Sequence, residues 1–203
     1  MKKFSQIISA VFSPIVVLTY AVVIALWCSR LMFLPLNVRW HVVLLVFCIT
    51  AIVPLVAILC LKKLGVVTDP GLNNRSERTI PYIITGLAYA ACAVYLWRAN
   101  APGWLWLFMV GATVATLVSG VVNRWWKISA HMAAMGGLVA IMFRILGIGM
   151  AAPGVPFLLL TSLVVIAAGA VGTARVFLNS HTLLQVIAGA ANGFICVYLL
   201  SAF

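Results

Sequence analysis

The sequence has few acidic residues and little charge of any kind. Its 203 residues include two acids, Asp69 and Glu77, against 13 lysines and arginines, which gives a formal charge of +11. Only 7% of the residues are charged, 66% are hydrophobic, and the mean hydropathy is +1.22. A soluble domain cannot bury that much apolar surface, so the composition indicates an integral membrane protein.

The shortage of carboxylates argues against several kinds of site. Magnesium and calcium need several carboxylate oxygens. Two histidines, His131 and His181, lack the third protein ligand that zinc takes, and no serine stands beside a histidine–acid pair as a hydrolase triad requires. The five cysteines are odd in number and mostly lie in apolar runs, which is typical of small core residues and not of disulfides or a metal site.

The basic residues are scattered one or two per loop and form no stripe, which argues against nucleic acid as a partner. Anionic lipid headgroups, or an anionic substrate at the membrane surface, fit this pattern better.

The apolar runs are continuous, which favours transmembrane helices over a barrel whose strands alternate. We expect one all-α, polytopic helical bundle over residues 1–203, with six or seven spanning helices. The first apolar run is too long for a signal peptide and lacks a cleavage site, so it is interpreted as an uncleaved helix. The expected helices are 10–29, 41–61, 80–97, 104–122, 132–150, 157–174 and 182–201.

Three polar segments interrupt the apolar runs: residues 62–79, residues 123–131 and residues 175–181. Two helices separate each segment from the next, so all three are expected on one face of the membrane. The first segment also fits a solvated loop with an Arg–Glu pair. The second also fits an interfacial tryptophan, lysine and arginine anchor, which leaves only His131 unexplained.

Together the three segments would form a cationic cup with two histidines and almost no acids: Arg75, Arg78, Arg124, Lys127, His131, Arg175 and His181. Arginine binds phosphoryl oxygens through paired hydrogen bonds, and lysine supplies a point charge. One neutral histidine would attack phosphorus, and the other, protonated, would give a proton to the leaving oxygen. Such a site needs no metal or other cofactor, because its cations supply the electrostatic stabilisation.

The segments resemble, in order and position, the three motifs of the type 2 phosphatidic acid phosphatase family, whose fold is shared with vanadium haloperoxidases. The resemblance covers roughly residues 75–189. The family motifs K-x6-R-P, P-S-G-H and S-R-x5-H-x3-D are represented here by Arg75-x-x-Arg78-x-x-Pro81, Ile128-Ser129-Ala130-His131, and Ala174-Arg175-x5-His181-x3-Gln185.

The resemblance implies a role for each matched residue. His181 would be the nucleophile, and His131 the acid for the leaving group. Arg175 and Arg78 would bind phosphate, and Ser129 would contact it. Lys127 and Arg75 are additional cations near the phosphate that match no motif position.

The resemblance also implies a substrate and a location. The substrate would be a lipid phosphate monoester or diphosphate: phosphatidate, phosphatidylglycerophosphate, a polyprenyl diphosphate or lipid A. The expected location is the cell membrane, as a multi-pass protein, with the bacterial inner membrane implied by the family.

Three of the departures from the family pattern bear most on the chemistry. Gln185 replaces the aspartate that orients the nucleophile; it can accept the imidazole N–H but cannot stabilise an imidazolium. We therefore expect a slower enzyme, or one that recruits Glu77 or Asp69. Gly71 stands at the place of the first motif's lysine, and Ala130 replaces the glycine before His131.

Other functions remain open on the sequence. One is a catalytically impaired relative that binds an anionic lipid, suggested by Gln185. Another is a small transporter with His131 and His181 as a proton relay, although transporters place polar groups at mid-membrane and here they lie at predicted helix ends.

The membrane face of the site and the oligomeric state are also open. The positive-inside rule favours a cytoplasmic site, whereas the family usually works on the opposite side. Most of the charge bias comes from the candidate site residues themselves.

Overall fold

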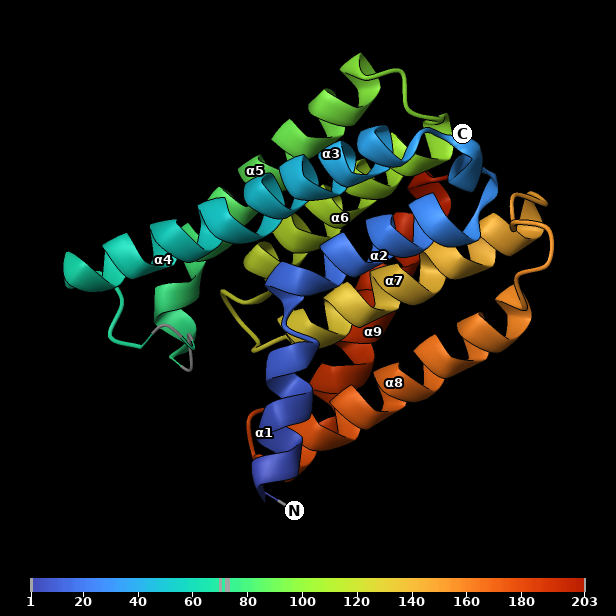
Figure 1. Cartoon of the computed structure of the whole chain (residues 1–203). Helices are drawn as coiled ribbons and strands as arrows, with labels where there is room; N and C mark the ends of the chain where they lie inside the picture. Colours follow the sequence, from blue (N-terminus) through green and yellow to red (C-terminus); the bar gives the residue numbers. More distant parts are fainter. Residues whose placement is uncertain (1, 70, 72–73, 203) are drawn as a thin grey trace.

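A computed structural model describes residues 2–69, 71 and 74–202 of the chain. Its described part is built from helices, with no strand, which confirms the expected all-α, polytopic bundle (Figure 1). The helices are α1 (Lys2–Val11), α2 (Pro14–Cys28), α3 (Leu36–Phe47), α4 (Val53–Lys63), α5 (Thr79–Arg98), α6 (Gly103–Val122), α7 (Ala130–Gly147), α8 (Phe157–Phe177) and α9 (Leu183–Leu200).

Six helical segments are long and apolar enough to cross a membrane. They are Leu36–Lys63, Arg75–Arg98, Gly103–Val122, Ala130–Gly147, Phe157–Phe177 and Leu183–Leu200. A helix of 20 residues is about 30 Å long, which matches the hydrocarbon core of a bilayer. The bent pair α1 and α2 makes a seventh if it counts as one span. The chain is therefore a membrane-embedded, multi-pass protein.

The expected first helix, 10–29, is broken in the structure. α1 ends at Val11, α2 begins at Pro14, and the two helices meet at 57°. Ser13 is extended (φ −60°, ψ 139°), the conformation that a following proline imposes, and proline is well suited to the first position of a new helix. α1 consequently leaves the direction of α2 and packs against α8 (Figure 1).

The second expected helix, 41–61, is longer in the structure and contains a π-helical turn. α3 begins at Leu36, so His41 lies inside the helix and does not open it. Between α3 and α4 the residues Cys48–Ile52 form the π-turn, which ends two residues before Pro54. Proline has no N–H to donate to the preceding turn, which accounts for the irregularity. The other five helices lie within three residues of their expected bounds at each end.

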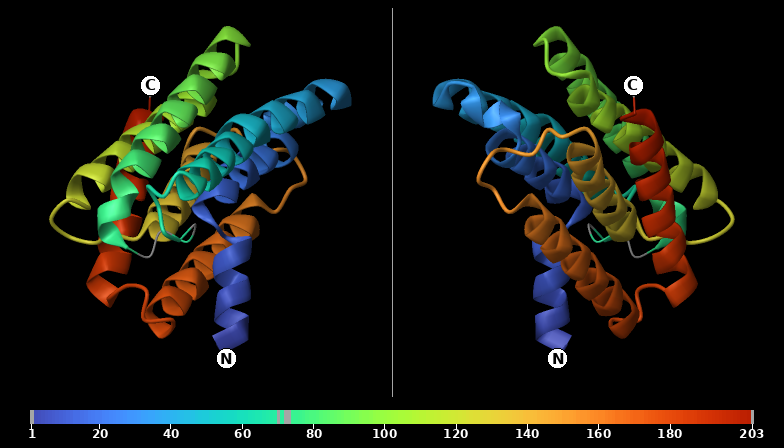
Figure 2. Two further views of the ribbon diagram at one scale, coloured as in Figure 1. Left: turned by 90° about the vertical axis from the view of Figure 1, so that its left-hand side faces the viewer. Right: turned by 90° about the vertical axis from the view of Figure 1, so that its right-hand side faces the viewer.

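α7 is the centre of the bundle and packs against α2, α6, α8 and α9, most extensively against α9 (Figures 1 and 2). Glycines make this approach possible. A Cβ atom on Gly193 would overlap the carbonyl oxygen of Ala133, and one on Gly136 would overlap that of Ala190. The Gly189-x-x-x-Gly193 pattern of α9 is thus a packing motif, as expected for small residues in membrane helices.

Candidate phosphate-binding site

The three polar segments meet at one end of the bundle. Arg78 precedes α5, His131 is the second residue of α7, Arg175 lies in the last turn of α8, and His181 lies just before α9. These four residues line one cavity of about 220 Å³, and among the described residues that line it there is no Asp or Glu. Residues separated by up to 103 positions in the chain are therefore brought to a common space that carries only positive charge and imidazoles.

The spacing between Arg175 and His181 is enforced by the local backbone. α8 ends at Phe177, and Asn179 adopts a left-handed conformation (φ 52°) that turns the chain back on the helix. The carbonyl oxygen of Arg175 then accepts hydrogen bonds from the backbone N–H groups of Ser180 (3.1 Å) and His181 (3.3 Å). The five intervening residues thus form a compact turn that returns the histidine to the arginine.

The imidazole of His181 is oriented by Gln185. His181 Nδ1 lies 3.2 Å from Gln185 Oε1, and the backbone N–H of Thr182 donates to the same oxygen at 3.2 Å. Thr182 and Gln185 form a capping box at the start of α9. An amide oxygen only accepts hydrogen bonds, so Nδ1 carries the proton and the lone pair of Nε2 is left available.

The protonation state of His181 is set by its surroundings. The side chain is 6% exposed. Burial, followed by the charges of Arg175 and Arg78, lowers the pKa of His181 to about 4, against the opposing effect of its hydrogen bond to Gln185. The imidazole is therefore neutral at pH 7, which is the form that can act as a nucleophile.

The two arginines of the cavity differ in their hydrogen bonding. Arg78 is 6% exposed, and its Nη1 donates to the carbonyl oxygen of Ile128 at 3.4 Å. Nε of Arg175 is buried and has no hydrogen-bond partner among the described residues. A buried donor without a partner is destabilising. The Nε atoms of Arg39 and Arg144 are also buried without a partner among the described residues, but only Arg175 of these three lines the cavity, where a ligand can supply the acceptor.

His131 is held by the N-terminal helix. Its Nε2 lies 3.1 Å from the backbone carbonyl oxygen of Ser9 in α1, and because a carbonyl can only accept, Nε2 carries a proton. A sequence pattern cannot reveal this contact, since any residue at position 9 would supply the same carbonyl group. α1 thus contributes to the site, and the sequence did not predict this contribution.

Ser129 lies beside the cavity and is not one of the residues that line it. It is fully buried, and its Oγ accepts a hydrogen bond from the backbone N–H of Met132 (3.4 Å) as the N-cap of α7. Its backbone N–H donates to the carbonyl oxygen of Gln185 (3.4 Å). A Cβ atom on Gly189 would lie 2.5 Å from the Ser129 carbonyl oxygen. Ser129 therefore joins the starts of α7 and α9, which carry the two histidines.

The remaining cations surround the cavity without lining it. Arg75 is exposed, and its guanidinium donates a hydrogen bond to the carbonyl oxygen of Trp125. The backbone carbonyl oxygen of Arg75 accepts a hydrogen bond from Asn123 Nδ2 (3.0 Å). These two bonds connect the segment before α5 to the loop before α7. Burial and the charges of Arg78 and Arg175 lower the pKa of Lys127, so this amine lies close enough to add to the positive potential. Arg124 is exposed.

The acids serve other contacts. The Glu77 carboxylate accepts hydrogen bonds from the backbone N–H (2.8 Å) and Oγ1 (2.9 Å) of Thr68 and from Asn74 Nδ2 (3.0 Å). Asp69 Oδ1 accepts from the backbone N–H of Gly71 at 3.0 Å. The partner that orients His181 is consequently Gln185, and the expected recruitment of Glu77 is not what the structure shows.

A metal site would need at least three suitable side chains close together. Within residues 2–69, 71 and 74–202 no group of three or more His, Cys, Asp or Glu side chains is placed to hold a metal ion. The cysteines in this part of the chain are all free.

Neither a protein-family model, nor a curated protein, nor a solved structure matches the chain. The functional assignment therefore depends on the chemistry of the site itself.

Proposed function

We propose that the chain is a membrane-embedded phosphatase that hydrolyses a lipid phosphate monoester or diphosphate through a phospho-histidine intermediate, without a metal. The observation that carries the proposal is the pairing of a buried Arg175 Nε, without a partner in the described part of the chain, with a neutral His181 whose Nε2 is available, in a cavity whose described lining holds no carboxylate. Membership of the type 2 phosphatidic acid phosphatase family, and a bacterial inner membrane location, are proposed from the motif resemblance alone.

In the first step the guanidinium groups of Arg78 and Arg175 bind the phosphoryl oxygens and stabilise the charge of the transition state. Nε2 of His181 attacks phosphorus, forming the P–N bond while the P–O bond to the lipid breaks. His131, as the imidazolium that the phosphate's negative charge favours, gives its proton to the leaving oxygen. Gln185 accepts the Nδ1–H of His181 throughout.

In the second step water replaces the histidine. His131, now neutral, accepts a proton from the water while the water oxygen attacks phosphorus and the P–N bond breaks. Inorganic phosphate leaves, His181 returns to its neutral form, and His131 is again an imidazolium. Gln185 cannot offset the positive charge of the intermediate as a carboxylate would, so turnover is expected to be slow.

The experiment is phosphate release by the purified full chain from lipid phosphates in mixed micelles, with and without EDTA, for wild type, His181→Ala and His131→Ala. His41→Ala is the matched control, because His41 is exposed on α3 and is the third histidine of the chain. We expect EDTA-insensitive release, unchanged in His41→Ala. Loss of the acid in His131→Ala should slow release by about 10²–10⁴-fold.

His181→Ala should abolish both release and an acid-labile phosphoryl label trapped on the wild-type protein. Release that survives His181→Ala would remove the mechanism. Tight binding of anionic lipid without any release would instead identify a lipid-binding protein.

A further inference from the structure

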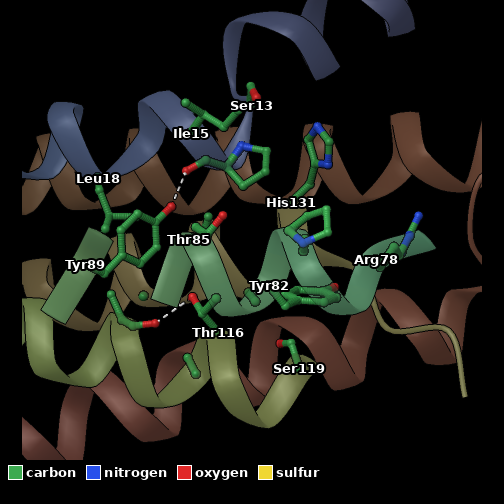
Figure 3. A pocket seen from close by; sticks show the side chains of 18 of the residues that line it. Ser13, Ile15, Leu18, Arg78, Tyr82, Thr85, Tyr89, Thr116, Ser119 and His131 are labelled. Atoms are coloured by element: carbon green, nitrogen blue, oxygen red, sulfur yellow. Dashed lines mark hydrogen bonds between the residues drawn. The ribbon is translucent and has the colours of Figure 1, made fainter. Parts of the chain in front are cut away.

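The cavity extends well beyond the groups that would hold a phosphate. Arg78, just before α5, is followed at successive turns along one face of that helix by three further lining residues, Tyr82, Thr85 and Tyr89. At 1.5 Å per residue, Arg78 and Tyr89 are separated by about 16 Å along the helix. Figure 3 shows Arg78 and Tyr82 on one side of the cavity and Tyr89 with Leu18 on the other. The space therefore continues from the charged end toward the middle of the bundle.

The inner part of the cavity, which we name the inner chamber, is apolar. Its walls include Leu18, Phe108, Ala112, Gly137 and Val197, which come from α2, α6, α7 and α9. Two of its hydroxyl groups are occupied, since Tyr89 donates to the carbonyl oxygen of Pro14 (3.3 Å) and Thr116 donates to that of Ala112 (2.7 Å) (Figure 3). Because apolar cavities do not retain water well, a hydrocarbon is the natural occupant.

Small residues create the room for this occupant. Ala112 on α6, and Ala134 and Gly137 on α7, line the inner chamber, while the larger side chains of Phe108 and Val197 close it. On α7, Ala134 lies one turn beyond His131. On α6, Ser119 also lines the cavity, and Ala112 lies two turns from it, farther from the charged end. A longer side chain at either alanine would shorten the inner chamber without touching Arg175 or His181.

The size of the cavity restricts the kind of lipid. A dry cavity of about 150 Å³ accommodates one benzene molecule, so 220 Å³ holds a phosphoryl group and the beginning of one hydrocarbon chain. The glycerol and ester groups of a diacyl phosphate are bulkier and more polar than the first carbons of a single chain, so they suit this mostly apolar space less well.

We propose that the inner chamber binds the first carbons of a single hydrocarbon chain to which the phosphate is directly attached, as in phosphate or diphosphate esters of long-chain or prenyl alcohols. The inference rests on the proposed phosphatase function and selects among its possible substrates. Glycerol-based diacyl phosphates are the poorer class.

The experiment compares kcat/KM for farnesyl phosphate, phosphatidate and the short, water-soluble p-nitrophenyl phosphate. The variants are Ala112→Leu and Ala134→Leu, which fill the inner chamber. The control is Ala91→Leu, an exposed alanine of α5 outside the cavity. We expect wild type to prefer farnesyl phosphate to phosphatidate. Either filling variant should lose at least about tenfold on farnesyl phosphate, the worth of about two buried methylenes, and should lose less on p-nitrophenyl phosphate, whose single ring occupies only the part of the cavity next to the phosphate.

Three results would overturn the inference: equal loss on farnesyl and p-nitrophenyl phosphate in both variants, no loss on either, or a wild-type preference for phosphatidate. The short substrate also shows that a variant is folded. If wild type released phosphate from none of the substrates, the proposed function would fail separately. Thermal stabilisation by farnesyl phosphate, present in Ala91→Leu and absent in both filling variants, would then still test the inner chamber.

Discussion

His181 is the residue whose protonation state controls the proposed chemistry. Its pKa is lowered to about 4 by burial and by the charges of Arg175 and Arg78, so protonation removes the nucleophile only below that pH. We expect kcat/KM for p-nitrophenyl phosphate to fall on the acid side with a midpoint near 4, and not near the ordinary histidine value of about 6.5.

Arg175→Gln should move this midpoint to higher pH, because a repelling cation is removed, and should lower activity by about 10–100-fold through the loss of a charge-assisted hydrogen bond to phosphate. Arg98→Gln, at the exposed far end of α5, is the control and should leave the profile unchanged. A wild-type midpoint near 6.5 would contradict the buried environment of His181.

The lowered pKa of His181 also makes the folded protein less stable as the pH falls from about 6.5 to 4, since over this range the histidine takes up a proton only in the unfolded chain.

At the scale of elements, the contact between α7 and α9 positions the two histidines. Gly193 lies against the carbonyl of Ala133, so Gly193→Ala would force the helices apart. We expect a destabilisation of about 1–3 kcal/mol, together with a loss of phosphate release, because His131 and His181 lie at the starts of these two helices. Thermal unfolding in detergent and the release assay would measure the two effects.

Gly169→Ala on α8 is the matched control for Gly193→Ala. A Cβ atom there has no neighbour within 4 Å, so stability should be unchanged or slightly higher. If both variants were as stable and active as wild type, close packing of α7 on α9 would not be what holds the site together.

For the whole molecule, the bent pair α1 and α2 decides the topology. If the pair crosses the membrane once, the chain makes seven crossings and its two termini lie on opposite faces. Figure 2 shows the two ends of the chain at opposite ends of the bundle, which favours seven crossings. The end of the bundle with the site also carries Lys2, Lys3, Lys62 and Lys63, whereas the other end carries Arg30, Arg39, Arg98 and Arg144.

The larger total of cations at the site end, with Arg75, Arg78, Arg124, Lys127 and Arg175 included, favours a cytoplasmic site end by the positive-inside rule. We therefore expect a reporter fused to the N-terminus to be cytoplasmic and one fused to the C-terminus to be outside. Two reporters on the same face would mean that α1 and α2 do not cross the bilayer together.

The sequence by itself determined the fold class, the approximate bounds of most helices and the shared location of the three polar segments. These follow from local patterns: apolar runs of spanning length must form helices in lipid, and an even number of crossings returns the chain to the same face.

Only the tertiary structure decided how the histidines are held and what lies behind them. Ser9 contacts His131 through a backbone carbonyl, which no residue type identifies, and the direction that α1 takes after the break at Pro14 is set by its packing on α8. The inner chamber is space between four helices, so its depth depends on their tilt and separation. Gln185, by contrast, reaches Thr182 and His181 from only three and four residues away, so its contact with the imidazole is local and was expected from the sequence.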